Sequence, residues 1–246
     1  MPCFQSLLVE KSLLMVSYNF RMNEKQSATR YDGVLPSHMA LDIWEIYARL
    51  VLQHIDSATY GGLLHGDKPD LFDNYRELGV EVTQAISTEG QEAGSLYTRL
   101  NETEDEAERS RLVERIEQLG AKVCDHVLFG PNGKDSFDLI LSIFKNKLAK
   151  INNGGYRQFA HNHLLIRSDI LAGEEMLGSA LLQFANLNES PQSFERVIVS
   201  VPGHNYDFDL LATSYHDLPF SSNDQYEMAE KARTLAIEAD SNHAAK

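Results

Sequence analysis

The sequence has only two cysteines, Cys3 and Cys124, among 246 residues. Two cysteines exclude the disulfide framework of a small secreted domain, and their spacing gives no zinc site. No uninterrupted run approaches the 18 or so apolar residues that a membrane-spanning helix needs. The apolar stretch near the start contains Glu10 and Lys11, whereas a secretory signal carries its charge before the apolar run. These absences predict a cytoplasmic protein without a membrane anchor.

Positive charge is also scarce, because 22 Lys and Arg face 36 Asp and Glu, for a formal net charge of −14. A nonspecific duplex binder usually has an excess of basic residues, so the balance argues against that class. Much of the negative charge is concentrated in one segment, so a local basic strip can exist elsewhere on the surface. The acidic residues of this segment are Glu102, Glu104, Asp105, Glu106, Glu108, Glu114 and Glu117. The nucleophile-elbow, Walker-type and dinucleotide-binding glycine patterns are absent.

With 43% apolar residues, the chain can bury a substantial core as one large domain with appendages. We expect a partly disordered extension over 1–35 and an α/β domain over 36–220. A helical insertion at about 88–122 interrupts that domain, and a C-terminal helix and tail occupy 221–246.

Residues 69–83 predict two short strands joined by a polar turn, with Asp70 on the first strand and Glu81 on the second. Because side chains alternate along a strand, Glu81 projects from one face while Val80 and Val82 point to the other. Two neighbouring carboxylates repel each other, and a hard divalent cation such as Mg²⁺ or Mn²⁺ removes that cost. The alternative is that Asp70 caps a turn and Glu81 lies on a solvent-exposed face.

Periodicity predicts the elements around this hairpin. Before the hairpin we expect a helix over about 38–56, capped by Ser37, and a short strand within 61–66. After it come helices over 88–100 and 104–120, a short strand or loop at 123–129, a break at 130–133 and a helix from 135 or 136 to 151. The rest of the chain predicts a strand at 163–166, a helix over 173–187, a strand over 194–201 that pairs with 206–212, and a helix over 228–239. On the first helix, Glu45 is four residues before Arg49, which favours a surface ion pair over a role in a metal site.

The helix ending at Ile151 has a clear apolar stripe, formed by Phe137, Ile140, Phe144, Leu148 and Ile151. At about 100° per residue, Lys147 lies roughly 60° from the centre of the stripe, Lys145 about 100° and Lys150 about 120°. Lys147 is therefore the lysine best placed to reach inward. An ordinary solvated lysine whose stem covers the edge of the core is the alternative.

Pro69-Asp70 followed by Glu81-Val82-Thr83, within an order of helix, three strands, helix and strand, resembles the PD-(D/E)xK nuclease superfamily. The resemblance covers roughly residues 38–170. It implies a restriction-endonuclease-like α-β-β-β-α-β core, with a mixed central sheet flanked by helices and a helical insertion. The family hydrolyses phosphodiester bonds, so the resemblance implies nucleic acid as the partner, and DNA before RNA. The sequence does not decide between a monomer and a homodimer.

Carried over to this chain, the resemblance makes Asp70 and Glu81 ligands of Mg²⁺ or Mn²⁺, with the Val82 carbonyl beside them. The motif lysine is replaced by Thr83, so Lys147 becomes the third catalytic candidate and Gln84 a weaker one. Thr83 also allows a catalytically inactive binding or interaction module of the same fold. The residues expected to contact substrate are Thr83, Gln84, Lys145, Lys150, Tyr156 and Arg157, with Arg167 on the same basic strip and with Glu45 and His65 as accessory candidates.

Two histidine groups offer a different chemistry. His161 and His163 share one face of a predicted strand, and His204 and Asp207 flank a predicted turn. A zinc hydrolase needs a third well-placed ligand, and the sequence shows none.

Overall fold

The computed structural model describes residues 41–124, 127–129, 136–170 and 172–244. The predicted extension over 1–35, the Ser37 cap and the break at 130–133 lie outside these residues. The first helix, α1 (Ile43–Ile55), begins after Asp42, whose carboxylate accepts a hydrogen bond from the Trp44 N–H.

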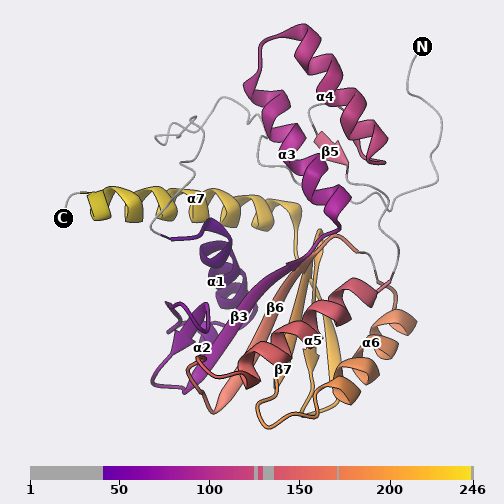
Figure 1. The fold of residues 1–246 in the computed structure, drawn as a ribbon. Coiled ribbons are helices and arrows are strands. Elements are labelled where there is room, and N and C mark those ends of the chain that lie inside the picture. Colours follow the sequence, from indigo (N-terminus) through magenta and orange to yellow (C-terminus); the bar gives the residue numbers. More distant parts are fainter. Residues whose placement is uncertain (1–40, 125–126, 130–135, 171, 245–246) are drawn as a thin grey trace.

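A seven-stranded mixed sheet forms the centre of the molecule (Figure 1). Its strands are β1 (Leu64–His65), β2 (Leu71–Asp73), β3 (Leu78–Ala85), β6 (His161–Ser168), β7 (Arg196–Val201), β8 (His204–Asp209) and β9 (Ser214–Pro219), in the order β1-β2-β3-β6-β7-β8-β9. The three central strands β3, β6 and β7 are parallel, and the pairs on either side are antiparallel. The expected α/β class with a mixed central sheet flanked by helices is confirmed.

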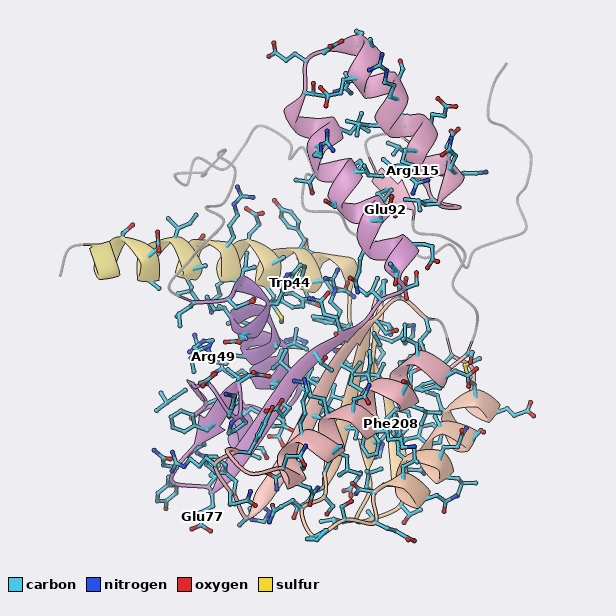
Figure 2. The ribbon with its side chains drawn as sticks, viewed as in Figure 1. Trp44, Arg49, Glu77, Glu92, Arg115 and Phe208 are labelled. Carbon is cyan, nitrogen blue, oxygen red and sulfur yellow. The ribbon has the colours of Figure 1, made fainter. Side chains whose placement is uncertain are left out.

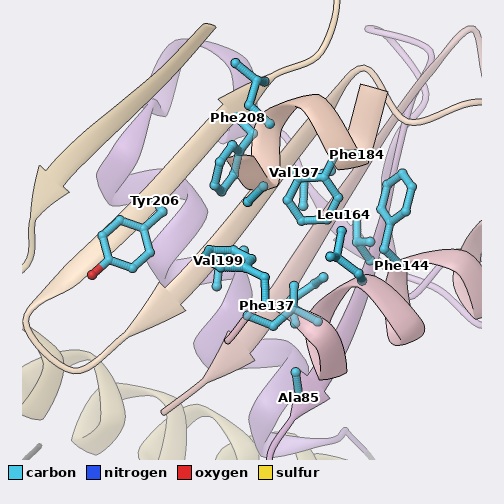
Figure 3. Packing of buried hydrophobic residues seen from close by; sticks show 14 of the residues in the cluster. Ala85, Phe137, Phe144, Leu164, Phe184, Val197, Val199, Tyr206 and Phe208 are labelled. Atoms are coloured by element: carbon cyan, nitrogen blue, oxygen red, sulfur yellow. The ribbon is translucent and has the colours of Figure 1, made fainter. Parts of the chain in front are cut away.

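Helices cover both faces of this sheet (Figure 1). On one face lie α5 (Asp138–Asn152) and α6 (Glu174–Leu187); on the other lies α1, with α7 (Ser222–Ala244) packed along it and the short α2 (Ser57–Tyr60) following it. The core beneath α5 and α6 is aromatic, and Phe137, Phe144, Phe184 and Phe208 meet there (Figure 3). All five residues of the predicted apolar stripe are buried, so that prediction is confirmed.

The insertion extends away from the sheet (Figure 1) and consists of α3 (Thr88–Glu102), α4 (Glu106–Gln118), β4 (Lys122–Cys124) and β5 (Val127–Phe129). It has its own cluster of buried apolar side chains, in which Tyr97 of α3 packs with Ile116 of α4. Glu92 and Arg115, labelled in Figure 2, form an ion pair of 2.7 Å across the two helices. The insertion was predicted to end at about 122, and Leu128 of the β4–β5 hairpin belongs to the same cluster.

One strand was missed and one further prediction was wrong. The edge strand β9 was missed because none of its residues is buried and the strand shows no apolar alternation. His204 and Asp207 do not flank a turn, since both lie within β8, which pairs with β7 as expected. Among the described residues, none of the helices has the length and apolar character that crossing a membrane requires.

Candidate metal centre

The β2–β3 hairpin places Asp70 at an open edge of the sheet. Leu71 is opposite Val80, so Asp70 immediately precedes β2 rather than lying on it, and its neighbour across the hairpin is Glu81. The Asp70 Oδ2 atom accepts a hydrogen bond of 2.7 Å from the Val82 N–H. In a complete sheet, the carbonyl oxygen of a neighbouring strand would accept a hydrogen bond from the Val82 N–H. The Asp70 carboxylate accepts it here instead. Asp70 therefore does not cap a turn.

Glu81 lies in the middle of β3 and is only 2% exposed, so the alternative of a solvent-facing side chain is wrong. As the alternation predicts, Val80 and Val82 pack into the cluster beneath α1, and Glu81 points to the other face. Its Oε1 atom is buried, and no group of the described residues forms a hydrogen bond with it. A buried carboxylate oxygen without a partner is costly unless a cation or donor satisfies it.

Lys147 reaches from α5 to this carboxylate. Its Nζ atom lies 2.6 Å from Glu81 Oε2, 3.2 Å from the Val82 carbonyl oxygen and 3.7 Å from Asp70 Oδ2. The side chain is 14% exposed, so the alternative of an ordinary solvated lysine is wrong. Burial alone would lower the pKa of Lys147, but the hydrogen bond and charge of Glu81 outweigh it and raise the pKa. Two oxygens from β3 and one from the residue just before β2 thus lie around one ammonium group.

The repulsion expected between the two carboxylates acts on Asp70. Burial first, and then the charge of Glu81, raise the pKa of Asp70 to about 6, although the Val82 N–H and Lys147 act in the opposite direction. Asp70 therefore resists ionisation in a position where its carboxylate must be charged to bind a cation.

This donor set fits a hard divalent cation. Carboxylates of Asp70 and Glu81 and the Val82 carbonyl are all oxygen ligands, the kind that Mg²⁺ and Mn²⁺ prefer. Glu81 Oε1, which no donor of the described part of the chain reaches, is an additional acceptor. Within the described ranges, no three or more His, Cys, Asp or Glu side chains are grouped to hold a metal ion. A site here would thus use two carboxylates and a carbonyl, and Mg²⁺ commonly completes its shell with water and substrate phosphate.

The accessory candidates lie on the α1 side of the hairpin. Glu45 Oε2 is 3.6 Å from His65 Nδ1, and no ion pair joins Glu45 to Arg49 among the described residues. The expected surface pair was therefore wrong, because β1 brings His65 to α1, which helix spacing cannot indicate. After burial and Glu81, the charge of Glu45 also raises the pKa of Asp70, so Glu45 is near the site without being a ligand in it.

The loop after α5 closes the site at one end. Tyr156 is partly buried there, and burial followed by the charge of Glu81 raises its pKa. The Arg157 guanidinium lies over the rings of Phe159 and Phe72, 4.6 Å and 5.3 Å from their centroids, and donates to Asn74 Oδ1 at 2.5 Å. Arg157 thus fastens this loop to the hairpin.

The other expected substrate contacts are divided between two faces. Thr83 is half-buried on the Glu81 face of β3, whereas alternation places Gln84 on the opposite face, away from Lys147. Lys145 and Lys150 are exposed on α5. The structure thus brings together Asp70, Glu81, Val82 and Lys147, and it leaves Lys145, Lys150 and Gln84 outside that cluster.

The histidines have other partners. His163 Nδ1 lies 2.9 Å from the Tyr60 hydroxyl, and burial lowers the pKa of His163 to about 3. His161 pairs with Glu195 at 2.9 Å, and His204 with Asp217 at 2.7 Å. Asp207 is buried in a two-point contact with Arg196, so it is not free to bind a metal.

Sequence reasoning missed Trp44. The guanidinium of Arg167 on β6 lies 4.2 Å from the centroid of the Trp44 ring on α1. Arg167 was expected on a basic strip with the α5 lysines, but it is on the other face of the sheet. The parallel pairing of β3 with β6 creates this arrangement, and spacing within one element gives no signal for it.

Replacing Asp70 with Asn is expected to stabilise the metal-free protein. The pKa of Asp70 is raised to about 6 in the folded state, so the folded protein holds a proton on this carboxyl more tightly than the unfolded chain does. The free energy of unfolding therefore falls as the pH rises from about 4 to 6. Asn removes this penalty and can still accept from the Val82 N–H. Unfolding with urea in EDTA should show a gain that grows to about 1–3 kcal/mol above pH 6. Asp67→Asn, at an exposed position, is the control; an equal gain at pH 4 and pH 7.5 would contradict the expectation.

No protein-family model, curated protein or solved structure matches the chain. The resemblance to PD-(D/E)xK nucleases therefore stays a prediction from the sequence.

Proposed function

We propose that this protein is a metal-dependent nuclease that hydrolyses phosphodiester bonds. One observation carries the proposal: Glu81 Oε2, the Val82 carbonyl oxygen and Asp70 Oδ2 lie within 2.6–3.7 Å of a single cationic group, Lys147 Nζ. Three oxygen acceptors thus meet at a strand edge, and we infer that a divalent cation can bind to them where an extended polymer can approach.

The order of elements supports the same proposal. Apart from the four-residue α2 after α1 and the α3–β5 insertion after β3, the order of α1, β1, β2, β3, α5 and β6 is the α-β-β-β-α-β order that the resemblance implies. β6 then pairs with β3 in parallel. Glu81 on β3 and Lys147 on α5 support the proposal, whereas Asp70 lies just before β2 and not on the strand where it was expected.

The residues suit the chemistry of phosphodiester hydrolysis. A divalent cation held by Asp70, Glu81 and the Val82 carbonyl would supply Lewis-acid stabilisation of the phosphoryl oxygens and an acidified water. Lys147 keeps a positive charge at the site, since its pKa is raised, and its flexible stem allows it to donate to a phosphate oxygen. Tyr156, together with Arg157 in its contact with Asn74, closes one end of the site.

A noncatalytic binding module is the second candidate function. The position of the Lys147 ammonium group beside Glu81 favours it. Lys147 Nζ already balances the charge of Glu81 at 2.6 Å, and Thr83 occupies the place of the motif lysine. In this candidate the lysine is a permanent counterion, and the fold serves to bind nucleic acid or another partner without cleaving it.

Incubation of the purified protein with labelled single-stranded and duplex DNA separates the two candidates. We expect cleavage in Mg²⁺ or Mn²⁺ and none in EDTA, because both carboxylates require a cation to act on phosphate. Calorimetric titration with Mg²⁺ provides a second readout. Binding of DNA without cleavage in either metal, together with no Mg²⁺ uptake, would establish the second candidate instead.

A further inference from the structure

The Lys147 ammonium group lies at the position that the three candidate ligand oxygens define. Glu81 Oε2 and the Val82 carbonyl oxygen accept hydrogen bonds from Nζ at 2.6 Å and 3.2 Å, and Asp70 Oδ2 is 3.7 Å away. These are the oxygens that a divalent cation at this site would use. The side chain therefore supplies, from α5, the positive charge that such a cation would bring to the same place.

The ammonium group and a divalent cation exclude each other from these oxygens. Mg²⁺ lies about 2.1 Å from its oxygen ligands, so on Glu81 Oε2 it would be within about 5 Å of an ammonium group that donates to the same atom. Both side chains of this ion pair are largely buried, so the repulsion between the two cations is weakly screened.

The balance of charge leads to the same result. The carboxylates of Asp70 and Glu81 carry at most two negative charges, and a divalent cation balances both without help. The positive charge of Lys147 is then surplus in a position that is largely removed from water. A cation that uses all three oxygens therefore requires Nζ to leave them.

The edge of the sheet allows the ammonium group to move away. β2 pairs with β3 only as far as Leu71 opposite Val80, and on that side no described strand pairs with β3 beyond this point. Asp70, at this edge, is partly exposed. Lysine has a flexible four-carbon stem, so rotation about the side-chain bonds of Lys147 can carry Nζ toward solvent while α5 stays in place.

We propose that Lys147 is a built-in competitor of the metal: it keeps the cation position closed in the metal-free protein, and Nζ must leave Glu81 and Val82 before a divalent cation can bind there. The proposal rests on the proposed function and adds a regulation of the same site. The ion pair sets a threshold of metal concentration, because the apparent affinity for the cation is reduced by the fraction of molecules in which Lys147 is released. The released ammonium group is then free to donate to a phosphate oxygen of the substrate.

The first test measures how accessible the Lys147 amine is to an acetylating reagent. The wild type is treated briefly with an N-hydroxysuccinimide ester of acetic acid at pH 8, in EDTA, in Mg²⁺ and in K⁺ of equal ionic strength. Mass spectrometry quantifies the acetylated lysines. We expect Lys147 to react at least about tenfold faster in Mg²⁺ than in EDTA or K⁺, because the buried ion pair shields the amine. Lys145 and Lys150, exposed on the same helix, are the internal controls and should react equally in all three solutions.

The second test removes the competitor. Lys147→Met keeps most of the apolar stem without the charge, so in calorimetric titration it should bind Mg²⁺ at least about tenfold more tightly than the wild type. Lys145→Met removes the same charge from an exposed position of α5 and should bind Mg²⁺ like the wild type. Circular dichroism melting confirms that each variant is folded. The acetylation experiment uses the wild type, so it decides the question even if Lys147→Met does not fold.

The inference is overturned if Mg²⁺ binds while Lys147 stays as unreactive as in EDTA, since the cation would then use Glu81 Oε1 beside an intact ion pair. It is also overturned if a folded Lys147→Met binds Mg²⁺ no more tightly than the wild type, or if neither protein binds Mg²⁺. Failure of the proposed function looks different: Mg²⁺ would release Lys147, but no DNA would be cleaved. Cleavage in Mg²⁺ with an unreactive Lys147 would reject the competitor alone.

Discussion

Glu81→Gln is expected to reduce Mg²⁺-dependent cleavage by at least about 10³-fold. Gln preserves the volume of the side chain and an acceptor for Lys147, but it removes the negative charge that a cation requires. Lewis-acid stabilisation contributes several kcal/mol to such a transition state, and about 4 kcal/mol corresponds to a thousandfold change in rate. Initial rates on labelled single-stranded DNA, over a range of Mg²⁺ concentrations, measure the effect.

Glu77→Gln is the matched control for this experiment, since Glu77 is an exposed glutamate on the same hairpin (Figure 2). We expect its rate to equal that of the wild type. Weaker Mg²⁺ binding by Glu81→Gln in calorimetry would show that the loss arises at the cation site. Unchanged cleavage by Glu81→Gln would rule out the Asp70–Glu81 centre as the place of hydrolysis.

Lys147→Met should destabilise the metal-free protein by about 3–5 kcal/mol, the usual result of removing one partner from a buried ion pair. Glu81 is 2% exposed and would lose its counterion, while Met retains most of the apolar stem. Mg²⁺ should restore much of the loss, because a ligand at a hundred times its dissociation constant adds about 2.7 kcal/mol. Urea unfolding at pH 8, in EDTA and in Mg²⁺, gives both values.

Lys145→Met tests whether this effect belongs to the ion pair. Lys145 is exposed two residues earlier on α5, so the same substitution there should change stability by less than about 0.5 kcal/mol. If Mg²⁺ stabilises Lys147→Met no more than it stabilises the wild type, the three oxygens do not form a cation site, and Lys147 is a permanent counterion.

The local parts of the site were predictable from the sequence. Alternation along β3 correctly separates Glu81 from Val80 and Val82, and the helical angle of Lys147 correctly turns it inward. Both depend on one element at a time, whose geometry is fixed by its own hydrogen bonds. The depth of Glu81 was underestimated, because burial depends on α5 covering that face of the sheet.

Contacts between distant elements were not predictable. The Glu45–His65 pair and the Arg167–Trp44 stack depend on which strands are neighbours and on how α1 crosses them. A polar edge strand such as β9 carries no apolar signal, because among the described strands it pairs only with β8 and none of its side chains is buried. The nuclease activity itself stays a prediction.

The position of the α3–β5 insertion bears on which changes of length the sequence can tolerate. It separates Glu81 from Lys147, which are 66 residues apart in sequence and 2.6 Å apart in space. Because the insertion buries its own apolar cluster, the segment is a self-contained module joined to the sheet at the end of β3 and the start of α5. Changing the length of such a closed loop costs little, about 0.6 kcal/mol per doubling. We therefore expect that exchanging or shortening this segment leaves the distance between Glu81 and Lys147 unchanged.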